Sequence, residues 1–385
     1  MKEKTPTLLS YAFRPFFLVN GFFAILIVLA WMMTLHGMGL PAMTSLWHAH
    51  EMLVGFAMAA VAGFSLTAVA VWTGRPALCG LPLAWLMFCW LAGRLAMALS
   101  GWIPASLVML LDMLFPVLLC VLLAREIIGG GDRRNFLLIV VTAVMAAVNG
   151  VYHLGINQIV PNGDRLAVYL LIHTMLLLVT IIAGRIVPSF TGNWLRMQGR
   201  KHLPKTSVGL DLSAILLTVL VGLTASFTPV HPVTGALAFA AALAHGLRLS
   251  RWRGFTTTSN PLLFVLHAAY AWLPIGYALM GCSVYGWLFA PTAALHALTM
   301  GAIGSMVLAV TTRVALGHTG RTLQAARATV AAYWILMVAV VVRVFGPLTG
   351  AGYLVMIDLS AASWMLAFTI FMWVHWPILA RAKLD

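Results

Sequence analysis

The chain has 385 residues, of which 62% are hydrophobic and 8% are charged, and its formal net charge is +14 at pH 7. A soluble domain is about one quarter charged, so this composition excludes a soluble protein and indicates a membrane protein with several spans. The Lys and Arg residues gather in alternate connections between apolar runs, which points to membrane orientation and lipid headgroups and argues against a nucleic-acid partner.

Apolar runs of roughly 20 residues recur along the chain, and each is long enough to cross a bilayer as a helix. They predict an all-α polytopic membrane protein with twelve transmembrane helices. The connections are too short to hold a soluble domain, so we expect one transmembrane domain over residues 1–385. The spans are placed near residues 14–35, 47–72, 81–100, 103–124, 136–157, 165–188, 207–228, 233–249, 262–282, 288–316, 326–346 and 351–378.

The connections alternate in charge, and this alternation sets the expected orientation. The connection "TGNWLRMQGRKHLPKTSVGL" is basic, whereas "HGMGLPAMTSL" and "SFTPVHPVTG" carry no Lys or Arg. Basic connections tend to remain in the cytoplasm. Because the number of spans is even, both termini are expected on the cytoplasmic side.

Three histidines at the heads of the second, sixth and tenth spans indicate an internal period. His50, His173 and His296 are separated by 173 − 50 = 123 and 296 − 173 = 123 residues, and Asp112 and Asp358 are separated by twice that distance, 358 − 112 = 246. The period predicts three tandem repeats of four helices. Because four is even, the repeats insert in parallel, and we expect a pseudo-threefold ring. The repeats lie near residues 1–134, 135–257 and 258–385.

Ionisable residues inside a span are costly and mark functional sites. His50 and His296 occupy equivalent positions in the first and third repeats, in the outer half of the membrane. Histidine is a common nitrogen ligand of haem iron and copper. These two are the preferred axial ligands of a haem, and the alternative for each is an interhelical hydrogen bond worth about 1 kcal/mol.

Four more histidines are candidate metal or cofactor ligands, each with a structural alternative. His48 lies two residues before His50, roughly 200° around a helix, so the two cannot face one metal unless the turn is unwound. His173 is either a copper or second-haem ligand or a hydrogen-bonding group. His267 has no histidine counterpart in the first repeat, which favours a metal role. His318 ends the tenth span, where hydrogen bonding to free carbonyls competes with ligation.

Charged side chains within the spans are expected to support these ligands. Glu51 directly follows His50 and can accept a hydrogen bond from an imidazole N–H. Arg94 and Arg343 end the third and eleventh spans, where they bind haem propionates or an anion, or extend to lipid headgroups. Four further residues are expected to form Asp–Arg pairs or, as the bolder option, a proton route: Asp112, Asp358, Arg185 and Arg313. His153 and His375 are placed at the membrane interface. No chemistry is expected at the histidines in or beside connections: His36, His202 and His231.

Four segments resemble one family of bacterial membrane proteins: "FRPFF" (13–17), "WHAHEMLVGF" (47–56), "NPLLFVLHAAYAWLPIG" (260–276) and "HALTMGAIGSMVLAVTTRVALGHTGR" (296–321). Together they are similar to the NnrS family, twelve-span inner-membrane proteins of the nitric-oxide response that are described as containing haem and copper. The resemblance implies a b-type haem and copper as cofactors, nitric oxide as a small ligand, and location in the bacterial inner membrane.

A looser resemblance connects three four-helix repeats, with ligands on the second, sixth and tenth spans, to the core of haem–copper oxidases and nitric-oxide reductases. Two features of the copper site in those enzymes are absent from the sequence. The seventh span has no adjacent His-His pair, and the sixth has no His-x-x-x-Tyr after His173. The resemblance therefore gives no support for oxygen reduction or redox proton pumping.

These observations favour a haem-containing membrane protein that binds nitric oxide in the nitrosative-stress response. Turnover, as a nitric-oxide-metabolising oxidoreductase, would need an electron donor, and an external partner is one source of electrons. The chain itself has no CxxCH motif of the kind found in c-type cytochromes. One alternative is a transporter or exporter of a small metal or nitrosyl complex that uses the intramembrane histidines. Another is a scaffold in which the histidines only join helices.

Overall fold

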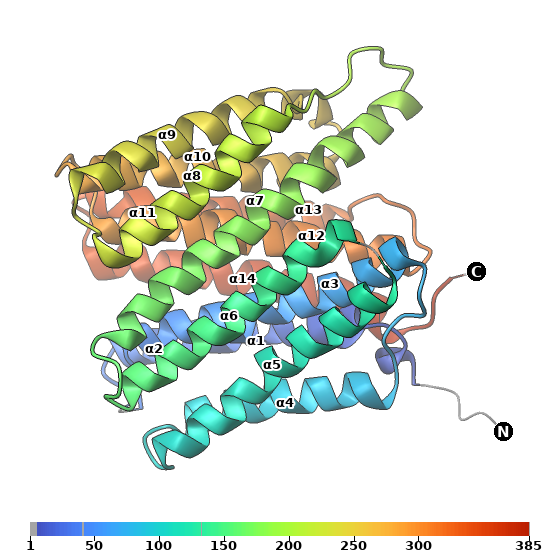
Figure 1. Cartoon of the computed structure of the whole chain (residues 1–385). Coiled ribbons are helices and arrows are strands. Elements are labelled where there is room, and N and C mark those ends of the chain that lie inside the picture. The colour runs from blue at the N-terminus through green and yellow to red at the C-terminus, as the bar shows by residue number, and fades with distance from the viewer. Residues whose placement is uncertain (1–5, 41, 132, 385) are drawn as a thin grey trace. The chain divides into compact units, whose positions relative to one another are not determined.

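The computed structural model describes residues 6–40, 42–131 and 133–384, and within them the chain forms helices and loops without a β-strand (Figure 1). Twelve helices are long and apolar enough to cross a membrane, which confirms the predicted number of spans. The α-helices are α1 (Phe13–Leu35), α2 (Ser45–His50), α3 (Met58–Thr73), α4 (Leu81–Ala98), α5 (Ala105–Gly129), α6 (Phe136–Ile156), α7 (Gly163–Met197), α8 (Val208–Phe227), α9 (Pro232–Ser250), α10 (Pro261–Val284), α11 (Pro291–His296), α12 (Ser305–His318), α13 (Arg327–Phe345) and α14 (Tyr353–Ala380).

Shorter helical segments complete the described chain. Four are 3₁₀ turns: η1 (Thr7–Leu9), η3 (Arg133–Asn135), η4 (Gly254–Thr257) and η6 (Gly346–Thr349). Two are π-helical: η2 (Glu51–Ala57), which joins α2 to α3, and η5 (Ala297–Gly304), which joins α11 to α12. The second and tenth spans are therefore each built from an α, a π and an α segment.

Most helices end within a few residues of the predicted limits, and α7 is the clear exception. It was expected to end near residue 188 but continues to Met197, with Pro188 inside it. The sequence "PSFTGNWLRM" is polar enough to read as a connection, and Pro normally ends a helix. In membrane helices a proline is tolerated, because neighbouring groups satisfy the carbonyl that it leaves free.

The two π-helical segments lie at equivalent points of the predicted first and third repeats. A shift of 246 residues places His50 on His296 (50 + 246 = 296) and the start of η2 on the start of η5 (51 + 246 = 297). π-Helical turns are uncommon and are frequent at functional sites. The shared position agrees with the 246-residue relation read from the sequence, while the full three-repeat ring stays a prediction.

Contacts divide the chain into two compact units. Unit 1 comprises the described residues of Met1–Leu171, Thr311–Thr322 and Phe368–Asp385, and unit 2 comprises Ile172–Val310 and Leu323–Ala367. Within unit 1, α4 packs on α5, α5 on α6, and α1 on α3; within unit 2, α9 packs on α8 and α10. These units are groups of contacts, so they do not test the predicted repeat boundaries.

Unit 1 brings the two ends of the chain together. The buried guanidinium of Arg14 donates from Nη1 to the carbonyl oxygens of Leu379 and Arg381, at 2.7 and 2.6 Å, and so caps the C-terminal end of α14. Phe13 and Phe17 pack with Leu379 in the same apolar cluster. The "FRPFF" segment therefore fixes the first and last spans of unit 1 to each other.

Candidate functional site

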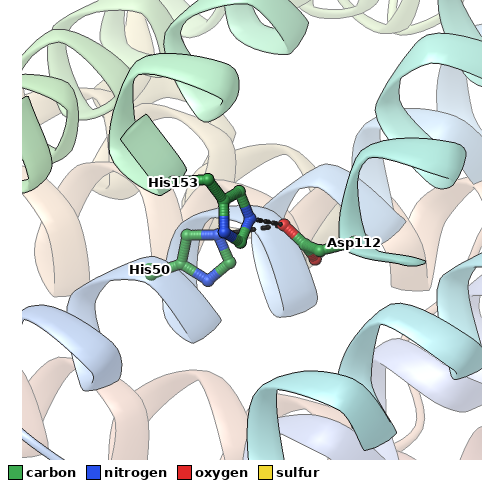
Figure 2. A group of neighbouring side chains, drawn as sticks. All are labelled: His50, Asp112 and His153. Carbon is green, nitrogen blue, oxygen red and sulfur yellow. Dashed lines mark hydrogen bonds and ion pairs between the residues drawn. The ribbon is translucent and has the colours of Figure 1, made fainter. Parts of the chain in front are cut away.

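Three buried side chains of unit 1 converge on one point. His50 at the end of α2, Asp112 on α5 and His153 on α6 are 0%, 0% and 1% exposed, respectively. Oδ2 of Asp112 lies 2.8 Å from Nε2 of His153 and 3.3 Å from Nε2 of His50, and Figure 2 shows both rings turned toward this carboxylate. All three offer a donor atom within 4.8 Å of the others, a spacing that suits a shared metal ion.

The position of His50 is set by the start of its span. Thr44 caps α2, and its hydroxyl accepts a hydrogen bond from the backbone N–H of Trp47 at 3.2 Å. The indole N–H of Trp47 donates to the carbonyl of Met97 on α4 at 3.0 Å. His50 follows at the last residue of α2, where the π-helical turn begins, so these two contacts fix the short helix that carries its ring.

A network of ion pairs surrounds the converging groups. The guanidinium of Arg94 on α4 pairs with the carboxylate of Glu51 through Nη1 and with that of Asp112 through Nη2. Gly93 makes this possible, because a Cβ atom at this position would lie 3.0 Å from Oδ1 and 3.1 Å from Cα of Asp112. The missing side chain lets α5 approach α4 closely enough for the pair to form.

Asn149 on α6 makes hydrogen bonds to both His50 and Asp112, the two candidate ligands that lie on other helices. Its Nδ2 donates to Oδ2 of Asp112 at 2.7 Å and reaches Sδ of Met113 at 3.5 Å, and its Oδ1 lies 2.8 Å from Nε2 of His50. His153 stands one helical turn further along the same face of α6. Both polar groups of α6 therefore point to the same carboxylate, and a metal at Nε2 of His50 would take the place of the Asn149 contact.

The net charge of this cluster depends on its two imidazoles. With neutral imidazoles, Glu51 and Asp112 contribute two negative charges and Arg94 one positive charge, which leaves one negative charge in a fully buried position. A buried, uncompensated charge is strongly unfavourable. Either a proton on an imidazole or a bound cation would compensate it, and two imidazoles with one carboxylate form a donor set suited to iron(II), copper or zinc.

The residues at His50 fit a metal ion better than a haem. Nδ1 of His50 lies 3.0 Å from Oε1 of Glu51, and Nε2 faces Asn149 and Asp112, so the nitrogen that points away from Glu51 is turned toward another potential metal ligand, Asp112. The ring of Tyr152 stacks on the imidazole with ring centroids 4.3 Å apart. The imidazole–carboxylate contact through Nδ1 is the usual support of a metal-bound histidine. A haem shared by His50 and His296 stays a prediction.

The other predicted ligands in unit 1 have structural contacts. His48 is half-buried and stacks on Trp31 with ring centroids 4.9 Å apart, on a different side of α2 from the cluster. The ring of His318, at the end of α12, lies 5.7 Å from that of Phe13. Neither residue belongs to a group of three or more potential metal-ligating side chains among the described residues.

The three predicted ligands in unit 2 have different local surroundings. His173 on α7 is 4% exposed, and neither ring nitrogen has a hydrogen-bond partner. Nε2 of His267 on α10 lies 2.9 Å from the hydroxyl of Thr191. Nδ1 of His296 lies 2.7 Å from the carbonyl oxygen of Thr292.

The remaining charged candidates are distributed over several helices. Arg343 at the end of α13 lies over the ring of Tyr353, 5.9 Å from its centroid. The Asp–Arg pair expected for Asp112 forms with Arg94, not with an arginine of the sixth or tenth span. The other three charged candidates lie in three different helices: Asp358 in α14, Arg185 in α7 and Arg313 in α12.

Two residues of the cluster were missed by the sequence analysis. His153 was assigned to the membrane interface, but the structure buries it beside Asp112, and Asn149 received no role. The available signal is their spacing: they are the polar residues of "NGVYH", four apart in an apolar span, and so share one helix face. Arg94, expected at haem propionates or headgroups, is instead held by two carboxylates.

Comparison with known proteins agrees with the motifs of the sequence. A family profile described as NnrS protein matches residues 7–383, nearly the whole chain. A comparison with curated proteins found no match. The match covers every described span and the cluster of unit 1, and the chain therefore belongs to the NnrS family.

Proposed function

We propose that this chain is a membrane metalloprotein of the nitric-oxide response, in which His50, Asp112 and His153 bind a redox-active first-row transition-metal ion, iron or copper. The observation that carries the proposal is the convergence of two imidazole nitrogens on one carboxylate oxygen in a fully buried cluster. Membership of the NnrS family supports the role in the nitric-oxide response.

Each residue of the cluster has a distinct task in this proposal. His50 and His153 supply nitrogen ligands, and Asp112 supplies an oxygen ligand and negative charge. Glu51 orients the ring of His50 through Nδ1, and Arg94 fixes the carboxylates of Glu51 and Asp112 in one geometry. When bound, the metal supplies a coordination position at which nitric oxide binds. The apolar spans around the site exclude water and admit a small neutral molecule.

Three protein ligands would leave room on such a metal for a small molecule, as in sites where two histidines and one carboxylate hold iron. Turnover of nitric oxide at such a site would need electrons from an external donor, whereas binding alone would not. The proposal is therefore nitric-oxide binding, with turnover as the activity to be measured once a donor is supplied. The transporter alternative is not favoured, because the histidine cluster of unit 1 forms one closed hydrogen-bonded network instead of a series of exchangeable sites.

The test is the metal content and the spectrum of the detergent-purified protein. We expect close to one iron or copper per chain, and a change in the visible or electron paramagnetic resonance spectrum when nitric oxide is added. His153→Ala removes a ligand that makes a single hydrogen bond, so the protein should fold and lose most of the metal. His202→Ala, in an exposed loop, is the matched control and should keep it.

A wild-type protein without a transition metal, even after reconstitution with iron(II) or copper, would contradict the proposal. Equal metal content in His153→Ala, His50→Ala and the wild type would contradict the choice of ligands. A metal-containing protein whose spectrum does not respond to nitric oxide would contradict the proposal that nitric oxide binds at this metal.

A further inference from the structure

A buried hydrogen-bonded network in unit 2 takes no part in the metal cluster of unit 1. It joins α8, α9 and α10 through the side chains of Thr218, His245 and Tyr270, each of which is 0% exposed. Nδ1 of His245 lies 2.8 Å from the hydroxyl of Tyr270, and Nε2 lies 3.0 Å from that of Thr218. The imidazole therefore connects a phenol on one side to an alcohol on the other.

The other contacts of the network fix the direction in which its protons point. Arg248 donates from Nη1 to the hydroxyl oxygen of Tyr270 at 2.9 Å, and a guanidinium can only donate. The phenolic proton is thus left to point at Nδ1 of His245. The hydroxyl of Thr218 donates its single proton to the carbonyl of Ala214 at 2.8 Å, so it accepts from Nε2–H. His245 consequently carries its proton on Nε2 and presents an unprotonated Nδ1 to the phenol.

The positive charge of Arg248 is compensated within unit 2. Its Nε donates to Oδ1 of Asp211 at 2.6 Å, and its Nη1 also donates to the carbonyl of Thr180 at 2.7 Å. Gly184 leaves room for the guanidinium, because a Cβ atom at that position would overlap Nη2. Since the ion pair is neutral, it opposes an added positive charge on His245 less than a lone guanidinium would.

An aromatic side chain connects Tyr270 to the end of α9. The ring of Trp252 lies 4.5 Å from that of Tyr270, measured between centroids. Trp252 is 1% exposed but lies between two exposed residues, Arg251 and Arg253. Two neighbouring aromatic rings therefore lead from the surface of unit 2 to the buried phenol, and an electron can move between them without any molecule entering the interior.

A tyrosine gives up an electron readily only when its phenolic proton leaves at the same time. A base that accepts this proton must lie within hydrogen-bond reach, and the 2.8 Å between the Tyr270 hydroxyl and Nδ1 of His245 meets that condition. The base must also be unprotonated on the facing nitrogen, as the contacts of Arg248 and Thr218 require here.

We propose that Tyr270 and His245 form a redox-active pair that gives one electron, by way of Trp252, to a strong outer-sphere one-electron oxidant. The oxidant takes an electron from Trp252, and the indole radical cation takes one from Tyr270. The phenolic O–H bond breaks, and its proton binds to Nδ1 of His245. The products are the singly reduced oxidant, a neutral phenoxyl radical and an imidazolium. The pair is independent of the metal site, and each proposal can fail while the other holds.

The test is photo-oxidation of the full-length protein in detergent, with ruthenium tris-bipyridine and persulfate as the source of the oxidant. Electron paramagnetic resonance measures the radical, and ring-deuterated tyrosine identifies it by narrowing the spectrum. Radicals on exposed tyrosines decay quickly by coupling, so the signal is recorded after a delay. We expect a long-lived tyrosyl signal in the wild type and loss of most of it in Tyr270→Phe, which keeps the packed ring.

Tyr277→Phe is the matched control. Tyr277 lies on the same helix, is also 0% exposed, and stacks on His245 with ring centroids 5.5 Å apart. The hydroxyl that faces Nδ1 of His245 is that of Tyr270. Tyr277→Phe should therefore keep the long-lived signal, and so should wild-type protein from which a chelator has removed the metal.

Two further variants separate the transfer of the proton from the transfer of the electron. His245→Gln keeps a hydrogen-bonding side chain that is not a base, so the radical should decay much faster than in the wild type. Trp252→Phe should slow formation of the radical without changing its lifetime. A wild type without a long-lived tyrosyl radical, or a signal that persists in Tyr270→Phe, would overturn the proposal. Equal loss in Tyr277→Phe and Tyr270→Phe would overturn it as well.

Discussion

Arg94 shows how a single residue determines the electrostatics of the unit 1 cluster. Its guanidinium pairs with two carboxylates at once, and all three groups are nearly inaccessible to solvent. The planar, forked guanidinium matches two carboxylates in a way that the single ammonium of Lys cannot. Arg94 thereby holds Asp112 where His50 and His153 meet it, although it is not itself a ligand.

Arg94→Gln should destabilise the protein strongly, because it leaves the carboxylates of Glu51 and Asp112 buried and without a cation. Breaking a buried pair in this way costs about 3–5 kcal/mol. Thermal unfolding in detergent measures the effect. Arg75→Gln is the control, since Arg75 pairs with Glu126 at a partly exposed position and should change stability by less than about 1 kcal/mol. Equal shifts in the two variants would contradict this account of Arg94.

Glu51→Gln tests the support that the carboxylate gives to His50. Loss of such a partner of a metal-bound histidine typically lowers metal affinity about 10–100-fold, and we expect a decrease of this size in a competition assay with a chelator. Glu126→Gln removes a carboxylate elsewhere in unit 1 that pairs with Arg75 and Arg125, and should leave affinity unchanged. Unchanged affinity in Glu51→Gln would show that the contact is only structural.

At the level of elements, glycines set how closely helices pack against two buried side chains. Gly93 brings α4 against α5 at Asp112, and Gly222 brings α8 against His173 on α7. The π-helical segments η2 and η5 act on the same scale, because each begins directly after a histidine at an equivalent point of the predicted repeats. Hydropathy alone predicts only which spans carry His50, Asp112 and His173. The glycine contacts and the π-helical segments add where these side chains lie relative to neighbouring helices.

Gly222→Ala should destabilise unit 2, since the added methyl group would overlap the side chain of His173. Overpacking of this kind costs about 1–3 kcal/mol. Gly209→Ala is a control on the same helix, because nothing lies within 4 Å of a Cβ atom at that position. It should leave the melting temperature unchanged or raise it slightly. Destabilisation by Gly209→Ala equal to that by Gly222→Ala would contradict the contact.

The helices also show which features of the fold and of the cluster the sequence predicts and which it does not. Helix number and most limits followed from hydropathy, because each span must satisfy its backbone hydrogen bonds internally. Glu51, Arg94 and Asp112 were identified as rare charged groups in apolar segments. Their mutual pairing, and the part of His153 and Asn149 in it, depend on how α4, α5 and α6 pack, which no local pattern encodes.

For the whole molecule, the distribution of Lys and Arg makes an independent prediction about orientation. Basic connections alternate with uncharged ones along twelve spans, so both termini are expected in the cytoplasm. The predicted location in the bacterial inner membrane rests on the same pattern and on the family. Twelve apolar helices agree with a membrane protein, and the orientation stays a prediction.

Reporter fusions test the orientation directly. A green fluorescent protein fused after Leu384 should fluoresce, because it folds in the cytoplasm. Alkaline phosphatase fused at Gly350, in the connection before α14, should be active, because that connection is expected on the periplasmic side. Phosphatase activity at the C-terminal fusion, with none at Gly350, would show the inverted orientation.

The binding of a metal ion by His50, Asp112 and His153 is the central claim, and X-ray absorption at the metal edge tests it most directly. The account predicts a shell of nitrogen and oxygen ligands at about 2.0–2.2 Å, with outer scattering from two imidazole rings that falls to one ring in His153→Ala. A shell dominated by sulfur, or a spectrum identical in wild type and His153→Ala, would contradict it.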